Sequence, residues 1–381
     1  MGPALFRCPN RQRTRGAVIN SSSPTTPPSP ASRTGTLGRL GCYVLPGAAH
    51  NPREGLDEAR AAEALGLGGV WIGERYDSKD LPTLASAIGQ VTRRVRIGAA
   101  VTHPILRHPM VLASMGQTLQ SLTGERFTLG FGRSADWRWK AYGTASPTLG
   151  MLGDIADILR RLWNGETVSY EGPLGDFPSL RLPVRLDLAP PPMLLAAVGP
   201  KTIALAGRCY DGVILHPFLT PEAVRRSRAT LREAAEATGR DPDSVRCIAT
   251  VAVAPAVTPE RERIAIHARA AGYLSVPGLG DAIARANGWD EADLAAYRAQ
   301  KPLTDLVGLP ADKHLTRQQL IDLCDGMPAS WLPSSSAAGD VAAVEAKLTE
   351  YFEAGADEVI LHGVVGGELT PLAEHYRGHG A

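Results

Sequence analysis

The stretch VRIGAAVTHPILRHPMVLASMGQTLQSLTGERFTLGFGRS, residues 95–134, contains the pattern that decides the fold. An apolar segment at 95–101 and another at 126–131 each have the length and composition of a short strand. Between them, His108-Pro109 is a helix start signal, because proline is accepted at the first helical position. The residues after it mark one apolar face at helical spacing: Val111, Met115, Leu119 and Leu122. The stretch therefore predicts a strand, a helix and a second strand, with polar and glycine-rich residues after each strand.

The remainder of the chain repeats this unit. Apolar segments rich in β-branched residues alternate with helical patterns, which predicts strands at 41–45, 69–73, 95–101, 126–131, 193–198, 211–215, 245–254 and 359–361. Segments that are apolar on both faces are typical of a parallel sheet that is covered on both sides. Eight such units predict a closed (β/α)8 TIM barrel. An open doubly wound sheet is the alternative, but no GxGxxG motif follows the first predicted strand.

We divide the chain into an extension, a barrel and two insertions. Residues 1–38 include SSSPTTPPSP and lack sustained periodicity, so we expect a disordered N-terminal extension before a barrel at 39–381. An organellar import segment is the alternative for this stretch of arginine and serine. Residues 167–188 are rich in proline, glycine and aspartate and predict a hairpin at the rim, whereas 273–330 contain helical pieces without an evident strand. We expect both segments to be insertions that shape a substrate pocket.

The overall composition excludes several classes of function. The net charge is +1, with 40 basic and 39 acidic residues, so nothing favours a nucleic acid or a membrane as partner. The five cysteines are widely spaced and form no CxxC pair, which argues against disulfides and fits the reducing cytoplasm. No apolar run approaches the roughly 20 residues of a membrane helix. No cluster of metal-ligating residue types has the spacing of a metal site, so we expect none.

In a (β/α)8 barrel, the functional residues follow the C-terminal ends of the strands. This rule selects Glu74, Arg75, Thr102, His103, Gly132, Arg133, Ser134, Gly199, Pro200, Lys201, Thr202, His216 and His362. The turn at Gly199 is the most informative. Its glycine allows a ligand close to the backbone, and the N–H groups of the following helix form the positive end of a dipole. We predict a phosphate-sized anion site there, with an ordinary glycine-proline helix start as the alternative.

Three side chains of this set can take part in chemistry directly. The Glu74 carboxylate can accept a hydrogen bond from a ring hydroxyl or amide, and the Arg75 guanidinium can bind an oxyanion. The alternative for both residues is an ion pair with each other. His103 can act as a general acid, because a histidine changes charge near neutral pH. A buried structural histidine is the alternative.

The motifs along the chain resemble those of the luciferase-like monooxygenase (bacterial-luciferase-like) superfamily. The resemblance spans about residues 40–365 and rests jointly on Ala62-Glu63-Ala64-Leu65-Gly66, Val70-Trp71-Ile72, His108-Pro109, 118–126, 129–132, 197–212 and 355–360. It implies a (β/α)8 barrel that binds a flavin or its 5-deaza analogue, coenzyme F420. The pattern is more similar to the F420-dependent branch, which includes methylenetetrahydromethanopterin reductase.

The resemblance also implies which residues hold the cofactor. In that branch a backbone bulge after strand three, often with a cis non-proline peptide, backs the ring; the matching residues are Ala100, Val101 and Thr102. The turn after strand five holds the phosphate, and the matching residues are Ala197, Val198, Gly199, Pro200 and Lys201. The acid after strand two contacts the ring system in relatives, and Glu74 occupies that position. The residues expected to edge the same pocket are Gly132, Arg133 and Ser134.

Two positions depart from the family pattern. Several deazaflavin dehydrogenases have a histidine directly after the acid of strand two, where this chain has Arg75. Some relatives carry an acid just after the strand-four glycine turn, where this chain has Ala135 and then Asp136. These departures weigh against the sugar-phosphate and secondary-alcohol dehydrogenase activities of those relatives. They leave the cofactor assignment unchanged.

The resemblance implies an oxidoreductase that transfers a hydride between coenzyme F420 and an unidentified small organic substrate. Arg75 or His103 is expected to polarise or protonate that substrate. The alternatives are an FMN-dependent monooxygenase of the same superfamily and a non-catalytic cofactor-binding barrel. A Schiff-base aldolase that uses Lys201 is a weaker alternative, because a lysine in a helix start favours a phosphate contact. The resemblance further implies a homodimer.

Overall fold

The computed structural model describes residues 35–47, 49–306 and 310–379. The predicted disordered extension at 1–38 lies almost entirely outside the described residues. Its last part is described, because Thr36–Arg39 forms a 3-10 helix, η2, that leads directly into the first strand. The division of the chain into an extension and a barrel stays a prediction.

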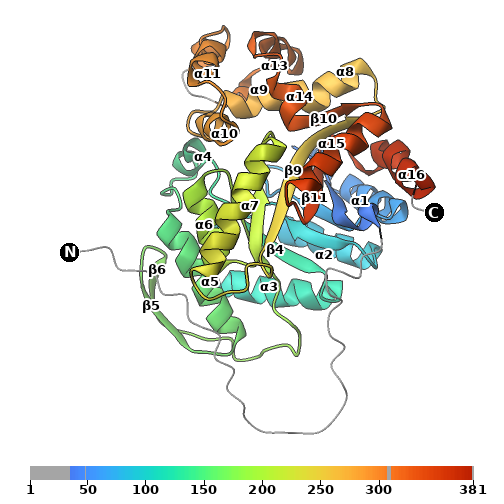
Figure 1. Cartoon of the computed structure of the whole chain (residues 1–381). Coiled ribbons are helices and arrows are strands. Elements are labelled where there is room, and N and C mark those ends of the chain that lie inside the picture. Colours follow the sequence, from blue (N-terminus) through green and yellow to red (C-terminus); the bar gives the residue numbers. More distant parts are fainter. Residues whose placement is uncertain (1–34, 48, 307–309, 380–381) are drawn as a thin grey trace.

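A closed barrel of eight parallel strands forms the centre of the molecule (Figure 1). Its strands are β1 (Leu40–Tyr43), β2 (Gly69–Ile72), β3 (Arg96–Ala99), β4 (Phe127–Phe131), β7 (Met193–Ala197), β8 (Gly212–Leu215), β9 (Arg246–Pro255) and β11 (Glu358–His362). Each strand pairs with the next in this order, and the pairing of β11 with β1 closes the barrel. All eight overlap a predicted strand, so the (β/α)8 prediction is confirmed.

Helices surround the barrel on its outside (Figure 1). They are α1 (Glu54–Leu65), α2 (Leu81–Val91), α3 (Pro109–Thr123), α5 (Leu149–Trp163), α6 (Pro200–Cys209), α7 (Pro221–Glu236), α15 (Val341–Glu353) and α16 (Thr370–His379), with a short α4 (Asp136–Ala141) after β4. The helix starts predicted from the sequence for α3 and α7 are present. His108 precedes α3 and its Nδ1 accepts from the Met110 N–H at 3.2 Å, while Thr220 caps α7 in the same way.

The apolar face predicted for α3 is partly wrong. Val111 and Leu122 are 52% and 46% exposed, so they do not face the barrel. The residues that α3 buries are Pro109, Leu112, Ala113, Gly116, Leu119, Gln120 and Thr123. The reason is a close helix contact at Gly116, where a Cβ atom would lie 2.7 Å from the ring of Trp163. Small residues set the orientation of this helix, and a pattern read from large apolar residues alone misses that.

Side chains that point into the barrel form successive layers. At the N-terminal end, Arg96 forms an ion pair with Glu358 of β11, a strand that is not its neighbour in the sheet. Above this pair lies an apolar layer: Trp71, Ala100, Leu194, Ile214, Ile248 and Ile360, with Tyr43, Val101 and Ala196 packed against it. The Trp71 ring fills the space left by glycines on both adjacent strands. A Cβ atom at Gly98 would lie 2.2 Å from this ring, and one at Gly41 would lie 2.7 Å from it.

The predicted hairpin between α5 and β7 is present. Strands β5 (Val168–Gly172) and β6 (Gly175–Leu180) pair antiparallel. The hairpin lies along the outer surface of two helices, because Tyr170 Oη donates to Asp154 of α5 at 2.8 Å and the Phe177 ring packs on His108 at the start of α3. These contacts are on the flank of the barrel. A role for the hairpin in shaping a substrate pocket stays a prediction.

The second insertion begins earlier than residue 273. A helical region follows β9 and comprises α8 (Pro259–Glu262), a π-helical turn (Arg263–His267), α9 (Ala268–Leu274), α10 (Leu279–Asn287), α11 (Glu291–Arg298), α12 (Ala311–His314), α13 (Arg317–Asp322) and α14 (Trp331–Ser335). Strand β10 (Ser336–Gly339) then pairs with the C-terminal part of β9. The region lies beyond the C-terminal end of β9, at the top of Figure 1, and Lys313 ties it to Asp77 of the loop after β2 at 2.8 Å. Among the described residues, no helix combines the length and hydropathy needed to cross a membrane.

The fit between Trp71 and Gly98 generates a stability prediction. We expect Gly98→Ala to lower the free energy of unfolding by about 1–3 kcal/mol, because the new methyl group overlaps the buried indole. Gly367→Ala is the matched control, since a Cβ atom there meets nothing within 4 Å. Denaturant unfolding of both variants and of the wild type measures the difference. Equal stability of the two variants would show that Trp71 has room to move.

Candidate functional site

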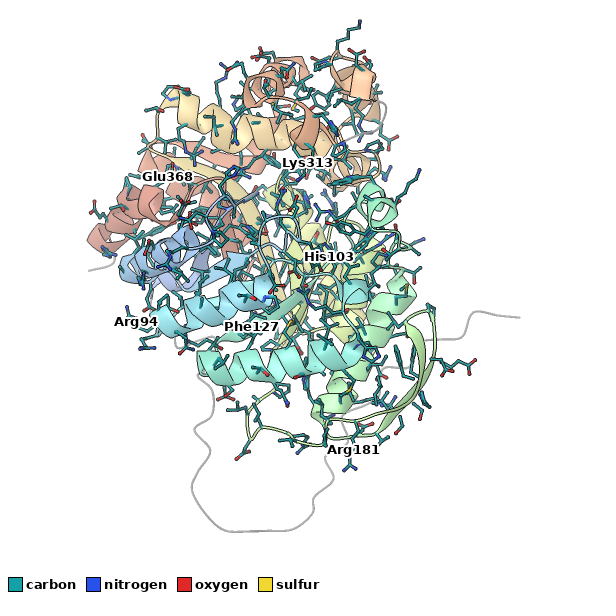
Figure 2. All side chains as sticks on the ribbon, turned by 180° about the vertical axis from the view of Figure 1, so that it is seen from behind. Arg94, His103, Phe127, Arg181, Lys313 and Glu368 are labelled. Carbon is teal, nitrogen blue, oxygen red and sulfur yellow. The ribbon has the colours of Figure 1, made fainter. Side chains whose placement is uncertain are left out.

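The C-terminal ends of the barrel strands and the helical insertion lie on the same side of the molecule. Figure 2 shows His103 between Phe127, at the start of β4, and Lys313 of the insertion. We call this end of the barrel the mouth. The parallel arrangement brings the predicted strand-end residues of β2, β3, β4, β7, β8 and β11 to this one end.

A backbone bulge follows β3 at the mouth. The peptide bond between Ala100 and Val101 is cis, as the family resemblance led us to expect. Hydrogen bonds from neighbouring elements fix the bulge: the Glu74 N–H donates to Val101 O at 3.1 Å, and Tyr43 Oη donates to Ala100 O at 3.1 Å. On the other side, the Thr102 N–H donates to Gly130 O at 2.9 Å. The bulge is therefore held by β1, β2 and β4 together.

Gly132 supports the bulge from β4. A Cβ atom at Gly132 would lie 2.4 Å from Val101 Cγ2, so only glycine leaves room for the Val101 side chain. The next two residues behave differently. Arg133 and Ser134 are exposed, and Arg133 Nε donates to Pro147 O at 2.9 Å. Of these three predicted site residues, Gly132 is the one that contacts the bulge.

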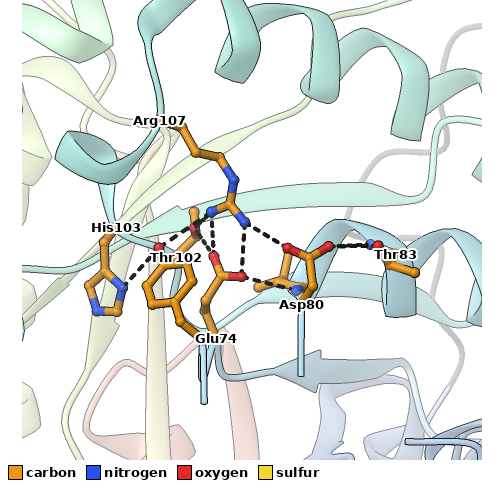
Figure 3. A network of polar contacts seen from close by, with 8 residues as sticks. Glu74, Asp80, Thr83, Thr102, His103 and Arg107 are labelled. Atoms are coloured by element: carbon orange, nitrogen blue, oxygen red, sulfur yellow. Dashed lines mark hydrogen bonds and ion pairs between the residues drawn. The ribbon is translucent and has the colours of Figure 1, made fainter. Parts of the chain in front are cut away.

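The Glu74 carboxylate lies at the centre of a buried polar network (Figure 3). Glu74 is 3% exposed and accepts hydrogen bonds from both terminal nitrogens of Arg107, with Nη2 at 3.0 Å. It also accepts from the Leu81 N–H at 3.0 Å and from the Thr102 hydroxyl. Arg107 Nη2 reaches on to Asp80 Oδ1 at 3.0 Å. Burial acts to lower the pKa of Arg107, but the hydrogen bonds and charge of Glu74 outweigh it and raise that pKa.

The alternative of an ion pair between Glu74 and Arg75 is wrong, because the partner of Glu74 is Arg107. Arg75 itself is half-buried, and in the described part of the chain its side chain makes no hydrogen bond or ion pair. Arg107 was not predicted as a site residue. It directly precedes a recognised helix start, yet no local pattern indicates that it reaches back 33 positions to Glu74.

His103 is buried beside the network. It is 3% exposed, its Nδ1 lies 3.4 Å from Tyr76 Oη, and its ring meets the Trp139 ring edge-on. Burial, aided by the charge of Arg138, lowers the pKa of His103 to about 4. The imidazole is therefore neutral near neutral pH. In that state it can donate one ring N–H, but it holds no second proton to release.

The turn before α6 is open. Ala197 is buried, Val198 and Gly199 are half-buried, and Pro200 and Lys201 are exposed. No side chain caps α6, and a Cβ atom at Gly199 would meet nothing within 4 Å. Pro200 has no N–H, and the Thr202 and Ile203 N–H groups donate to Gly199 O. Within the described residues, the Lys201 N–H is thus the donor at the start of this ten-residue helix that can bind an anion.

The opposite half of the mouth is covered by Tyr273 of α9. Its Oη lies 3.3 Å from His362 Nε2, and its ring packs edge-on against His216 at 4.7 Å. Burial lowers the pKa of His216 to about 4 and that of His362 well below its ordinary value. His362 Nδ1 and Thr250 Oγ1 are buried here without a hydrogen-bond partner. Tyr273 was not predicted as a site residue, because it lies in the insertion and carries no motif.

The described residues contain no metal-binding cluster. No group of three or more His, Cys, Asp or Glu side chains in residues 35–47, 49–306 and 310–379 is arranged to hold an ion. The four cysteines in these ranges are buried, and no disulfide joins them.

Comparison with known proteins identifies one family for this chain. The sequence profile described as luciferase-like monooxygenase matches residues 32–358. The 5,10-methylenetetrahydromethanopterin reductase of Methanolobus tindarius is 30% identical over 192 residues, which are 49% of this chain and 57% of the relative. An F420-dependent hydroxymycolic acid dehydrogenase of Mycobacterium tuberculosis is 30% identical over 246 residues, which are 60% of this chain and 65% of the relative. The matched regions thus span less than two thirds of these two relatives.

A solved structure agrees with the fold. The coenzyme F420-dependent tetrahydromethanopterin reductase from Methanopyrus kandleri superimposes with a TM-score of 0.75 over 90% of this chain and 99% of that chain. The two sequences are 19% identical, so this likeness concerns the fold.

The buried pair between Glu74 and Arg107 generates a stability prediction. We expect Arg107→Met to lower the free energy of unfolding by about 3–5 kcal/mol, because it leaves the buried carboxylate without its counterion. Arg225→Met is the matched control, since Arg225 pairs with Glu222 at the exposed surface, where such pairs contribute about 0–1 kcal/mol. Chemical denaturation measures both losses. A similar loss in the two variants would contradict the importance of the buried network.

The buried neutral state of His103 predicts a pH dependence of stability. The folded-state pKa is about 4 and lies below the unfolded value, so the unfolded chain binds the proton first as the pH falls. The stabilisation from neutral His103 is complete above about pH 6.5 and is lost towards pH 4, on the order of 2 kcal/mol by pH 5. We expect His103→Gln to reduce the loss of unfolding free energy between pH 7.5 and 5, and His50→Gln, at an exposed position, to leave it unchanged. An identical pH dependence in wild type and His103→Gln would overturn this assignment.

Proposed function

The chain belongs to the luciferase-like monooxygenase family, and from this premise we propose that it is an oxidoreductase that transfers a hydride between coenzyme F420 and a small organic substrate. The observation that carries the proposal is the bulge at Ala100-Val101, which is fixed from three strands and faces the mouth. The name of one relative supports the choice of cofactor, since it is an F420-dependent hydroxymycolic acid dehydrogenase.

The residues present fit a flat ring with a phosphate-bearing tail. The bulge offers a backbone surface, and Gly132 leaves room for Val101 beneath it. The open start of α6 offers the Lys201 N–H and an unobstructed Gly199. Buried polar atoms without partners, His362 Nδ1 and Thr250 Oγ1, lie in the same mouth. When bound, the cofactor supplies the hydride chemistry.

We assign the predicted cofactor-binding residues to four roles. The residues that back the ring are Ala100, Val101 and Gly132. The residues that hold the phosphate are Ala197, Val198, Gly199, Pro200 and Lys201, and those at the pocket edge are Arg133 and Ser134. Glu74 and Thr102 act as positioning residues, because their side chains are buried and satisfy each other and Arg107.

Arg75 and His103 are the proposed residues on the substrate side. The Arg75 guanidinium is always protonated, so it can stabilise negative charge that develops on a substrate oxygen but cannot deliver a proton. His103 is neutral and can donate one hydrogen bond from a ring nitrogen. A homodimer and a cytoplasmic location belong to the same proposal, on the family resemblance and the cysteine pattern.

Titration with oxidised coenzyme F420 and, separately, with FMN tests the proposal. We expect micromolar binding of F420, and binding at least tenfold weaker in Gly199→Val, because the added side chain projects into the open phosphate site and not into the protein. Gly367→Val is the matched control at another unobstructed glycine. Fluorescence quenching of the cofactor measures the affinity.

Other outcomes would redirect the assignment. Binding of FMN alone, with oxygen uptake when reduced FMN is supplied, would favour the monooxygenase. Tight binding without redox turnover on a broad substrate panel would favour a non-catalytic barrel. Failure to bind either cofactor at micromolar concentration would refute the proposed function.

A further inference from the structure

Helix α9 of the insertion presents two side chains to the mouth. Arg269 and Tyr273 are four positions apart and therefore lie on the same face of the helix. Tyr273 contacts His216 and His362, which end β8 and β11. Arg269 therefore also faces the strand ends, and its charge acts on Tyr43 at the end of β1. The insertion thus brings a cation over the mouth.

Arg269 has no partner within the described residues. No hydrogen bond or ion pair of its guanidinium is formed there, and its Nε atom is buried and unsatisfied. Burial lowers the pKa of Arg269; the charge of Tyr273 opposes this effect, and the charges of Arg317, Arg261 and Arg75 add to it. A half-buried cation among other cations is unfavourable unless something neutralises it.

Arg75 lies in the same part of the mouth. It follows β2, is half-buried, and makes no hydrogen bond or ion pair with its side chain in the described part of the chain. Its charge and that of Arg269 both oppose the rise in the pKa of Tyr273 that burial causes. Two guanidinium groups from separate elements therefore face one phenol.

The nearby carboxylates are engaged elsewhere. Glu74 pairs with Arg107, Asp77 pairs with Lys313 at 2.8 Å, and Glu368 pairs with Arg261 at 2.6 Å. Asp312, whose charge acts on Tyr273, is exposed. None of these acids therefore provides a buried carboxylate that pairs with Arg75 or Arg269.

The position of this pair separates it from the open start of α6. In the barrel order β1, β2, β3, β4, β7, β8, β9, β11, the strand opposite β7 is β1. Arg75 follows β2, and Arg269 acts on residues that end β1 and β11, so both lie across the mouth from Gly199. The mouth therefore has two separate places for negative charge.

We propose that Arg269 and Arg75 form a subsite for an oxyanion of the substrate, either a carboxylate or a phosphate, which lies next to Tyr273 and His362. Guanidinium groups bind both oxyanions through paired hydrogen bonds. The inference rests on the proposed function in one respect, namely that the organic substrate binds at this mouth. It adds that the substrate itself carries a negative charge when it binds.

Titration with inorganic phosphate tests the subsite, with the protein saturated with coenzyme F420. We expect phosphate to bind, and Arg269→Gln and Arg75→Gln each to weaken it at least tenfold. Arg317→Gln is the matched control, because Arg317 is exposed on α13 and also contributes positive charge near Arg269. We expect that control to change the affinity less than threefold. Isothermal titration calorimetry measures the affinities.

The thermal unfolding midpoint separates a binding role from a structural one. We expect Arg269→Gln to unfold at the same temperature as the wild type or at a higher one, since it removes an uncompensated buried charge. A midpoint several degrees lower, together with unchanged phosphate affinity, would show a structural arginine and overturn the proposal. Unchanged phosphate affinity in both arginine variants would overturn it as well.

The source of the oxyanion and the proposed function are tested separately. If F420 abolishes phosphate binding and Arg269→Gln weakens F420 itself tenfold, the subsite serves the cofactor and the substrate proposal is refuted. If F420 does not bind at all, the proposed function fails. The phosphate titration is then made on the free Gly199→Val variant, in which the α6 site is blocked, and a tenfold loss on adding Arg269→Gln still supports the subsite.

Discussion

The burial of the Glu74 carboxylate is the constraint on which the arrangement of the mouth depends. A carboxylate removed from water needs a counterion and hydrogen-bond donors, or it costs several kcal/mol. Arg107, Thr102 and the Leu81 N–H supply them, and these groups come from three different segments. One side chain thus fixes the end of β2, the bulge after β3 and the start of α2 relative to one another. The cis peptide at Ala100-Val101 is held inside this frame, because the Glu74 N–H also binds Val101 O.

The interior of the barrel supports this frame from below. The Trp71 indole fills the central layer, and the absence of side chains at Gly41 and Gly98 gives it the room. The same arrangement occurs at the bulge, where the absence of a side chain at Gly132 makes room for Val101. Glycines on the barrel strands therefore serve as sites of close packing and not as flexible points. The barrel interior is therefore closely packed directly beneath the mouth. Tyr273 of the insertion covers the part of the mouth next to His362.

The limits of sequence reasoning follow from the range of the interactions. The eight strands were predictable, because strands buried on both faces leave continuous apolar runs, and the bulge was predictable through the family pattern. The face of α3 was not, since the contact at Gly116 is defined by Trp163, which belongs to another helix. Arg107 and Tyr273 were missed for the same reason. Their partners lie 33 and 89 positions away, and no local periodicity encodes such a contact.

The charges at the mouth show why the net charge of a whole chain is a poor guide to the ligands that it binds. A net charge of +1 gives no reason to expect a nucleic acid surface, yet it averages over pairs that cancel, such as Glu222 with Arg225. Arg75 and Arg269 are not cancelled by any ion pair within the described residues. A folded chain that keeps half-buried cations unpaired is less stable than it needs to be, and such departures from the rules of folding concentrate at functional sites. The missing negative charge is then best sought in the molecule that the barrel binds.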